Sequence, residues 1–348
     1  MTGQAISIII PAHNEEAVIA RLLGSLSDHR ADDEIIVVCD GCSDRTAEIA
    51  RSFAGVTVVE QARGGKPSAL NSGDRRATLF PRFFVDADIV VSASALYEVA
   101  SLMIDGVEAG APRCEVDISN SSWLVRRFYD VWTRLAYFND HLMGSGVIGV
   151  TRRGRGRFAE LPDVINDDGY LCRLFTPEER VGRTASSFLV TAPANLAALA
   201  RIKTRVRLGN MQLDALQGPP PASGAAKGPL PASAAAKGPL PASAPAKGPP
   251  PASGAAKGPL PASAPATRRS AWKKLLISPS AWPAIVVFVA VRAVVEARAR
   301  RLFRRAEFDG WARDESSRVL TGPRQTGPRQ TAPRQTDPRK TGPGRPAY

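Results

Sequence analysis

Two aspartates, Asp86 and Asp88, are separated by a single residue near the end of an apolar stretch, RFFVDADIVVS, that begins at residue 82. Burying an unpaired carboxylate in such a stretch is costly. Either a cation lies against the two side chains, or they mark the turn where a strand leaves the core. Carboxylate oxygens are the ligands that Mg²⁺ and similar hard cations prefer. The pair therefore indicates a divalent-cation site or a strand-end turn, and the neighbouring motifs must decide.

Other polar clusters also follow apolar stretches, namely PAHNEE at 11–16, DGCSDRT at 40–46 and GGKPSALNSG at 64–73. Taken singly, each has a plain structural explanation. DGCSD suits a turn followed by a helix N-cap. The GGK stretch is not a phosphate-binding P-loop, because the G-x-x-x-x-G-K-[ST] spacing is missing. A further acidic pair, Asp167 and Asp168, lies in INDDGYL, where it could simply cap a helix.

The elements that must position these clusters alternate along the first 200 residues. Apolar runs at 5–10, 34–39, 56–60 and 82–88 predict buried strands, and apolar residues at helical spacing lie between the first three of them. Near-continuous apolar strands separated by helices predict an α/β fold with a mostly parallel sheet covered on both faces. Ligands of such sheets bind at the carboxyl ends of the strands, where all of these clusters are expected.

Five stretches occur together in one order: SIIIPAHNEE, VVCDGCSDRT, GGKPSALNSG, FVDADIVV and INDDGYL. On these motifs, residues 5 to about 210 resemble the family 2 glycosyltransferases, which have the nucleotide-diphospho-sugar transferase (GT-A) fold. The resemblance implies transfer of a sugar from a nucleotide diphosphate to a hydroxyl, with inversion and with Mg²⁺ or Mn²⁺ as cofactor. It favours the cation-site interpretation of the first aspartate pair.

The resemblance also implies roles for individual residues. Asp88 contacts the metal, and Asp86 faces the ribose or a metal-bound water. Lys66 brings a positive charge near the nucleotide or its phosphates, and Asp40 accepts a hydrogen bond from the base. The remaining nucleotide-pocket residues are Pro11, His13 and Glu15. Two roles stay open for His13, because it could stack on the base or merely fill the loop.

An inverting transfer needs a base that takes the proton of the acceptor hydroxyl. By the same resemblance Asp168 is this base, and Asp167 positions the acceptor. Two adjacent carboxylates repel each other, which raises the pKa of one of them and improves it as a base. The capping interpretation is compatible with this role.

Several arginines are candidates for anion contacts. Arg152 and Arg153 lie in the glycine-rich stretch GSGVIGVTRRGRGRF and could hold the diphosphate or a phosphorylated acceptor, although a plain solvated loop fits equally well. The Gln-x-x-Arg-Trp stretch of processive relatives has no match. Arg201 and Arg205, with Lys203 between them, occupy about that place. We therefore expect addition of a single sugar rather than processive synthesis.

Composition changes abruptly near residue 217. Residues 1–217 contain 24 basic and 27 acidic residues, so the overall charge of +13 belongs to the remainder of the chain. This argues against a nucleic-acid-binding domain. We expect a catalytic domain at 1–217, disordered Pro/Ala decapeptide repeats at 218–267, a basic and apolar helical segment at 268–320, and a disordered basic tail at 321–348.

Within the third segment, residues 280–305 predict an amphipathic helix whose apolar run, 281–291, is too short to span a membrane. Two alternatives remain open: the helix lies in an anionic membrane interface, or it packs on the domain. Residues 1–4 are polar and too short for a secretory signal, so we expect a cytosolic protein, peripheral on the inner face of the cell membrane. Cys39 and Cys42 form an isolated C-x-x-C, for which a buried strand end is favoured over metal or redox chemistry.

The partners that follow are a UDP-, GDP- or dTDP-sugar donor and a lipid-linked, saccharide or small-molecule acceptor, in cell-envelope or secondary-metabolite synthesis. The alternative is a non-catalytic or nucleotidyl-transferring protein of the same fold, tethered by its basic tail to a membrane or an anionic polymer. Nucleotidyl transferases of this fold carry an early G-x-G-T-R-type loop, which is absent after Ile10. The intact acidic residues at 86, 88, 167 and 168 favour catalysis.

Overall fold

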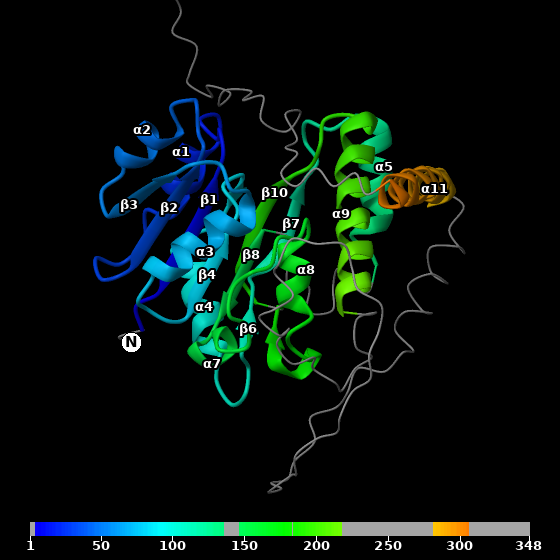
Figure 1. Cartoon of the computed structure of the whole chain (residues 1–348). Coiled ribbons are helices and arrows are strands. Elements are labelled where there is room, and N and C mark those ends of the chain that lie inside the picture. The colour runs from blue at the N-terminus through cyan, green and yellow to red at the C-terminus, as the bar shows by residue number, and fades with distance from the viewer. Residues whose placement is uncertain (1–3, 136–145, 183, 218–280, 306–348) are drawn as a thin grey trace, which may run out of the picture. The chain divides into compact units, whose positions relative to one another are not determined.

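The computed structural model describes residues 4–135, 146–182, 184–217 and 281–305 (Figure 1). The strands are β1 Ser7–Ala12, β2 Glu34–Asp40, β3 Val56–Gln61, β4 Arg82–Val85, β5 Ile89–Val90, β6 Ala109–Gly110, β7 Arg113–Asp117, β8 Val147–Val150, β9 Arg180–Val181 and β10 Ser187–Thr191. The helices are α1 Ile19–Ser25, α2 Thr46–Arg51, α3 Lys66–Arg76, α4 Ala93–Leu102, α5 Trp123–Trp132, α7 Arg152–Arg155, α8 Asp167–Cys172, α9 Leu196–Gln217 and α11 Trp282–Arg304. The expected repeats and tail lie outside the described residues.

The main sheet of the described residues has the strand order β3-β2-β1-β4-β8-β6-β9. The first four of these strands are parallel, as the near-continuous apolar runs predict, and Ile9 of β1 lies between Ile36 of β2 and Phe84 of β4. Direction changes at β8, which runs antiparallel to both β4 and β6. The polar residues that follow β1, β2 and β4 therefore share one edge of the sheet, next to the strand where the direction reverses.

The two faces of the sheet are buried under different helices because successive side chains of a strand point in opposite directions. Ile8 and Ile10 of β1 belong to the core that includes residues of α1, α2 and α4. Ile9 points the other way, into the core that includes residues of α3 and α8. The structure thus has the predicted mostly parallel sheet with helices on both faces.

A third core joins α5, α9 and α11 beside the sheet (Figure 1). Phe288 of α11 stacks on Phe128 of α5 with ring centroids 5.2 Å apart. Glu296 of α11 binds Arg207 of α9, with 2.7 Å between Oε2 and Nε. The expected helix at 280–305 therefore exists and packs on the domain through one side. None of the described helices combines the length and the apolar character that crossing a membrane requires.

Candidate active site

The two acidic pairs lie in different segments and meet at one lysine. Lys66 is the first residue of α3, and its Nζ lies 2.7 Å from Oδ1 of Asp86 and 2.9 Å from Oδ2 of Asp167. The lysine side chain is 12% exposed and that of Asp167 is 6% exposed, whereas Asp86 is 31% exposed. Lys66 thus ties the carboxylate that follows β4 to the acidic pair at the start of α8.

The backbone of Gly146 makes a second connection between the same segments. Its carbonyl oxygen accepts a hydrogen bond of 2.7 Å from the N–H of Asp86, and its own N–H donates to Oδ2 of Asp168 over 3.1 Å. Gly146 has a φ of +105°, and a Cβ added there would come within 3.0 Å of Cγ2 of Ile89. A side chain at this position would strain the connection.

The clustering of carboxylates changes their acidity. Burial raises the pKa of Asp168 to about 7, with Asp167 and Asp86 adding to the rise and Lys66 opposing it. Burial and the charge of Asp86 likewise raise the pKa of Asp88 to about 6. Burial alone would lower the pKa of Lys66, but the surrounding carboxylates outweigh it and hold the pKa well above its ordinary value. The ammonium is therefore a fixed positive charge among four aspartates.

The start of α8 has the capping geometry that the sequence allowed. The side chain of Asn166 accepts a hydrogen bond of 2.9 Å from the N–H of Gly169, and the two aspartates occupy the first turn. Negative charge is favourable there because the helix N-terminus carries partial positive charge. The same residues thus cap the helix and present the acidic pair.

Two of the residues expected to line a nucleotide pocket, His13 and Asp40, are bound to each other. His13 is buried, and its Nδ1 donates to the carbonyl oxygen of Asp40 over 2.7 Å while its Nε2 accepts from Nη1 of Arg63 over 2.7 Å. Because an arginine only donates, this fixes the neutral tautomer of the imidazole. These contacts hold His13 in the loop, and its stacking on a base remains a prediction.

Asp40 lies at the end of β2 and is fully buried. Its carboxylate accepts hydrogen bonds from the N–H groups of Gly64 and Gly65, at 2.8 and 2.9 Å, and from the amide of Gln61 at 2.8 Å. The aspartate therefore holds the loop that delivers Lys66. Contact between Asp40 and a base remains a prediction.

Pro11 is a buried residue of β1 that lies opposite Val38 of β2. Glu15 is buried after the same strand, where its N–H donates to Oγ1 of Thr46 over 2.7 Å and its carbonyl oxygen accepts from the N–H of Ile19. Pro11 thus lies within the strand, next to its last residue, and Glu15 lies in the loop that follows, so both are near the carboxyl edge of the sheet. Their contact with a nucleotide remains a prediction.

Arg152 and Arg153 do not lie at this site, and the expectation that they contact the diphosphate is wrong. Val147 of β8 lies opposite Val85, but Val150 lies opposite Arg82 at the other end of β4, because the strands are antiparallel. The arginines follow Val150 and therefore leave the sheet at the edge away from Asp86. There Arg152 lies over the ring of Phe80 and Arg153 pairs with Glu108.

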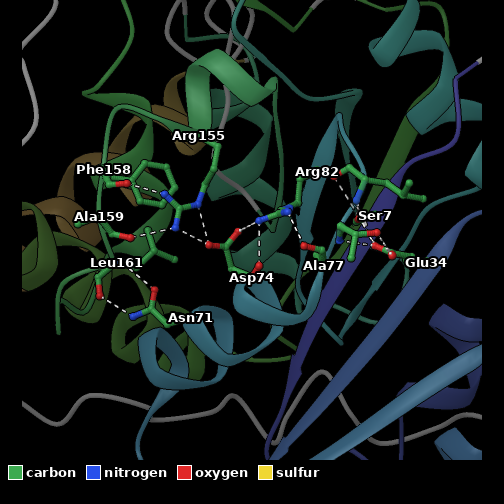
Figure 2. A network of polar contacts seen from close by, with 12 residues as sticks. Ser7, Glu34, Asn71, Asp74, Ala77, Arg82, Arg155, Phe158, Ala159 and Leu161 are labelled. Atoms are coloured by element: carbon green, nitrogen blue, oxygen red, sulfur yellow. Dashed lines mark hydrogen bonds and ion pairs between the residues drawn. The ribbon is translucent and has the colours of Figure 1, made fainter.

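The remaining arginines of the same stretch are structural, as Figure 2 shows for Arg155. Its Nε binds Oδ2 of Asp74 over 2.6 Å, and the other oxygen of Asp74 binds Nη1 of Arg82 over 2.5 Å. Asn71, one turn earlier on α3, exchanges two hydrogen bonds with the backbone of Leu161. These buried contacts fasten α3, and with it Lys66, to the segment that leads to α8.

Arg201 and Arg205 lie on α9, Arg201 exposed and Arg205 half-buried, and their contact with a diphosphate remains a prediction. Lys203 between them lies over the ring of Trp132, 3.9 Å from its centroid, and burial lowers its pKa to about 8. Further along the same helix, Asn210 accepts a hydrogen bond of 2.9 Å from Asn166. Helix α9 thus holds Asn166, the residue that precedes Asp167 and Asp168.

Sequence reasoning missed three residues that shape the site. Arg21 of α1 donates from Nη2 to the carbonyl oxygen of Asp88 over 2.8 Å, which fixes the turn after β4. Arg63 holds His13, and Gly146 joins the two acidic segments. Only Gly146 had a signal in the sequence, since it lies in the GSG stretch before an apolar run.

The described residues contain no group of three or more histidine, cysteine or acidic side chains arranged as a complete metal cage. Mg²⁺ and similar ions are commonly held by only one or two protein carboxylates together with substrate phosphates. Asp86 and Asp88 are such a pair: burial and, after it, the charge of Asp86 raise the pKa of Asp88, and a bound cation would stabilise both carboxylates in their charged form. The residues present therefore fit a metal site that a diphosphate completes.

Part of the chain matches a known protein family. Residues 7–156 match the model of Glycosyl transferase family 2. Among curated proteins, the chain is similar to the 4,4'-diaponeurosporenoate glycosyltransferase of Staphylococcus aureus (strain USA300), with 41% identity over 91 residues. That alignment covers 25% of this chain and 24% of the relative, so the chain spans about a quarter of the relative's length.

The chain is also similar to solved structures. A mannosyltransferase from Pyrobaculum calidifontis, in complex with GDP-Man and Mn²⁺, superposes with a TM-score of 0.55 and 17% identity, covering 88% of this chain and 89% of that chain. Glucosyl-3-phosphoglycerate synthase from Mycobacterium tuberculosis gives a TM-score of 0.47 and 21% identity over 63% of this chain and 83% of that chain. The first of these likenesses supports the GT-A fold.

Proposed function

We propose that this chain is a family 2 glycosyltransferase, which moves one sugar from a nucleotide diphosphate to an acceptor hydroxyl, with inversion and with a divalent cation; the match of residues 7–156 to that family's model supports the proposal. One observation carries the proposal. The carboxylate after β4 and the acidic pair of α8 converge on Lys66, and Gly146 joins the same two segments. A metal-side carboxylate and a base therefore face one site.

Asp168 is the residue that we assign as the base. An efficient base has a pKa close to the pH at which it works, and burial raises the pKa of Asp168 to about 7. The N–H of Gly146 binds one carboxylate oxygen and so orients the group. Asp167 is bound to Lys66, which lets it hold the lysine between the two halves of the site as well as position an acceptor.

Asp88 and Asp86 would hold Mg²⁺ or Mn²⁺. When bound, the ion neutralises negative charge on the diphosphate that leaves the sugar. Arg21 fixes the backbone at Asp88, and Lys66 adds a second positive charge beside Asp86. The mannosyltransferase with GDP-Man and Mn²⁺, which shares the fold, supports a nucleotide sugar and a divalent ion as ligands here.

The donor is a UDP-, GDP- or dTDP-sugar, and Pro11, His13, Glu15 and Asp40 belong to the loops that would receive its nucleoside. The acceptor is a lipid-linked, saccharide or small-molecule alcohol, in cell-envelope or secondary-metabolite synthesis. We place the reaction in the cytosol. Thermal-shift measurements with each donor class and Mn²⁺ identify the nucleotide, because a specific ligand raises the apparent stability.

Two substitutions test the separate roles proposed for Asp168 as the base and for Asp88 as a metal ligand. Asp168→Asn removes the base but keeps the shape of the side chain, so we expect loss of transfer with donor binding retained. Asp88→Ala should abolish donor binding that depends on Mn²⁺. Asp163→Asn, an exposed aspartate just upstream of α8, is the matched control and should behave as wild type. Full transfer activity in Asp168→Asn would refute the assignment of the base.

A further inference from the structure

Helix α11 is packed on the domain along only one side. Residues 284, 288, 291, 295 and 299 are buried, which is a single stripe at helical spacing. They face α5 and α9 in the third core, and the ion pair between Glu296 and Arg207 fixes the helix along its length. This packing sets which side of α11 the domain presents to its surroundings.

The opposite side of α11 is apolar and exposed. Trp282 is 60% exposed, Val286 66% and Val289 55%, and these residues are spaced so that they share one face. Pro283, Ala290, Ala293, Val294 and Ala297 are exposed beside them. Of the ten large hydrophobic residues exposed in the described chain, eight lie on α5, α9 and α11. Exposed apolar residues are ordinary when scattered, but a concentration of them indicates an interaction surface.

The same helix ends in positive charge. Helix α11 carries five arginines and one glutamate; all five arginines are exposed, Arg292 beside the apolar residues and the other four at 298, 300, 301 and 304. The single glutamate, Glu296, is bound by Arg207 and Arg300. An apolar stripe of about 18 Å, from 1.5 Å per residue over 282–294, is therefore followed by a basic end. This is the pattern of helices that lie in the interface of an anionic membrane.

We propose that the face of α11 formed by Trp282, Val286 and Val289 inserts into the headgroup region of an anionic lipid bilayer, with the arginines of the helix end binding the headgroups. A second copy of the chain is a poorer occupant, because its own α11 would offer arginines rather than acidic partners to these arginines. The two alternatives for residues 280–305 are thus combined, since one side packs on the domain and the other binds lipid. The inference does not depend on the proposed catalytic function.

Flotation of the full chain with vesicles tests the proposal. We expect binding to vesicles of phosphatidylcholine mixed with phosphatidylglycerol, and weaker binding to phosphatidylcholine alone. The double variant Val286→Ser/Val289→Ser should lower the affinity for the mixed vesicles at least about tenfold, or about 1.4 kcal/mol. The control variant is Leu102→Ser/Ile104→Ser, which removes two exposed hydrophobic residues at a different place: Leu102 is the last residue of α4 and Ile104 follows it. This variant should bind the vesicles as the wild type does.

The wild type and the two double variants have the same basic segments outside the described residues. Those segments therefore cannot cause a difference in vesicle binding between the three proteins. Equal binding by wild type and Val286→Ser/Val289→Ser would overturn the proposal, as would absence of binding by wild type. The proposal would also be overturned if the wild type formed a dimer in light scattering and did not bind vesicles, and if Val286→Ser/Val289→Ser abolished that dimer. The occupant of the face would then be a second copy of the chain. Circular dichroism checks that the variants are folded.

Discussion

Replacing Lys66 with methionine should destabilise the protein and raise the pH at which it works. The ammonium lies 2.7 Å from Asp86 and 2.9 Å from Asp167, and the side chain of Asp167 is only 6% exposed. Removing one partner of a buried ion pair leaves the other charge uncompensated, which costs about 3–5 kcal/mol. We expect a loss of this size in the free energy of unfolding at neutral pH, measured by urea titration.

The loss should depend on pH in one direction. Burial already raises the pKa of Asp168 to about 7, and Lys66 opposes that rise. Without Lys66 the pKa of Asp168 rises further, so the folded state holds its proton more tightly than the unfolded state. Such a group contributes stability at low pH and loses it as pH increases through the folded-state pKa. The deficit of Lys66→Met should therefore be larger at pH 8 than at pH 6, and the rise of transfer activity should shift to higher pH.

An exposed ion pair supplies the matched control. Arg75 and Glu160 are also 2.9 Å apart, but their side chains are 60% and 65% exposed. Pairs of this kind contribute at most about 1 kcal/mol, so Arg75→Met should change stability little. The double variant Lys66→Met/Asp167→Asn should recover part of the loss, because no buried charge remains unpaired at Asp167. Equal losses for Lys66→Met and Arg75→Met, or a deficit that does not vary with pH, would refute the reasoning.

Three further changes have expected outcomes. Initial rates of transfer should rise with pH up to about 7 and then level off, because the base must be deprotonated and burial raises the pKa of Asp168 to about 7; a flat profile would exclude it as the base. Gly146→Ala should lower the thermal midpoint by the equivalent of about 1–3 kcal/mol, because the position has a φ of +105° and the new Cβ would crowd Ile89; an unchanged midpoint would contradict this. Asp74→Ala should cost about 3–5 kcal/mol in urea titration, because it leaves buried Arg82 without its carboxylate; a loss below about 1 kcal/mol would show that the network is not needed.

The parallel half of the fold was predictable because its signals are local. Each apolar run at 5–10, 34–39, 56–60 and 82–88 is long enough to be a strand, and β1 to β4 lie within two or three residues of those bounds. Parallel strands that are buried on both faces read as continuous apolar runs. Their carboxyl ends share an edge, so the convergence of the motifs after β1, β2 and β4 followed from strand direction alone.

The partners of individual side chains were not predictable in the same way. Lys66 was expected near the nucleotide, but its contact with Asp167 joins residues 101 positions apart and depends on how α8 packs. Arg21 reaches the backbone of Asp88 from α1, where one arginine on a helix carries no distinguishing pattern. The side of α11 that faces the domain depends on how its side chains pack against α5 and α9. The apolar run of α11 alone does not predict this packing.

The reversal of direction at β8 explains both the wrong prediction and the missed residue. An apolar run of four residues, Val147–Val150, does not encode whether a strand is parallel or antiparallel to its neighbour. Because β8 is antiparallel to β4, the residues after it leave at the far edge, which removes Arg152 and Arg153 from the site. The same reversal brings the residue before β8, Gly146, to the end of β4. The strand that carries the arginines away is thus preceded by the residue that joins Asp86 to Asp168.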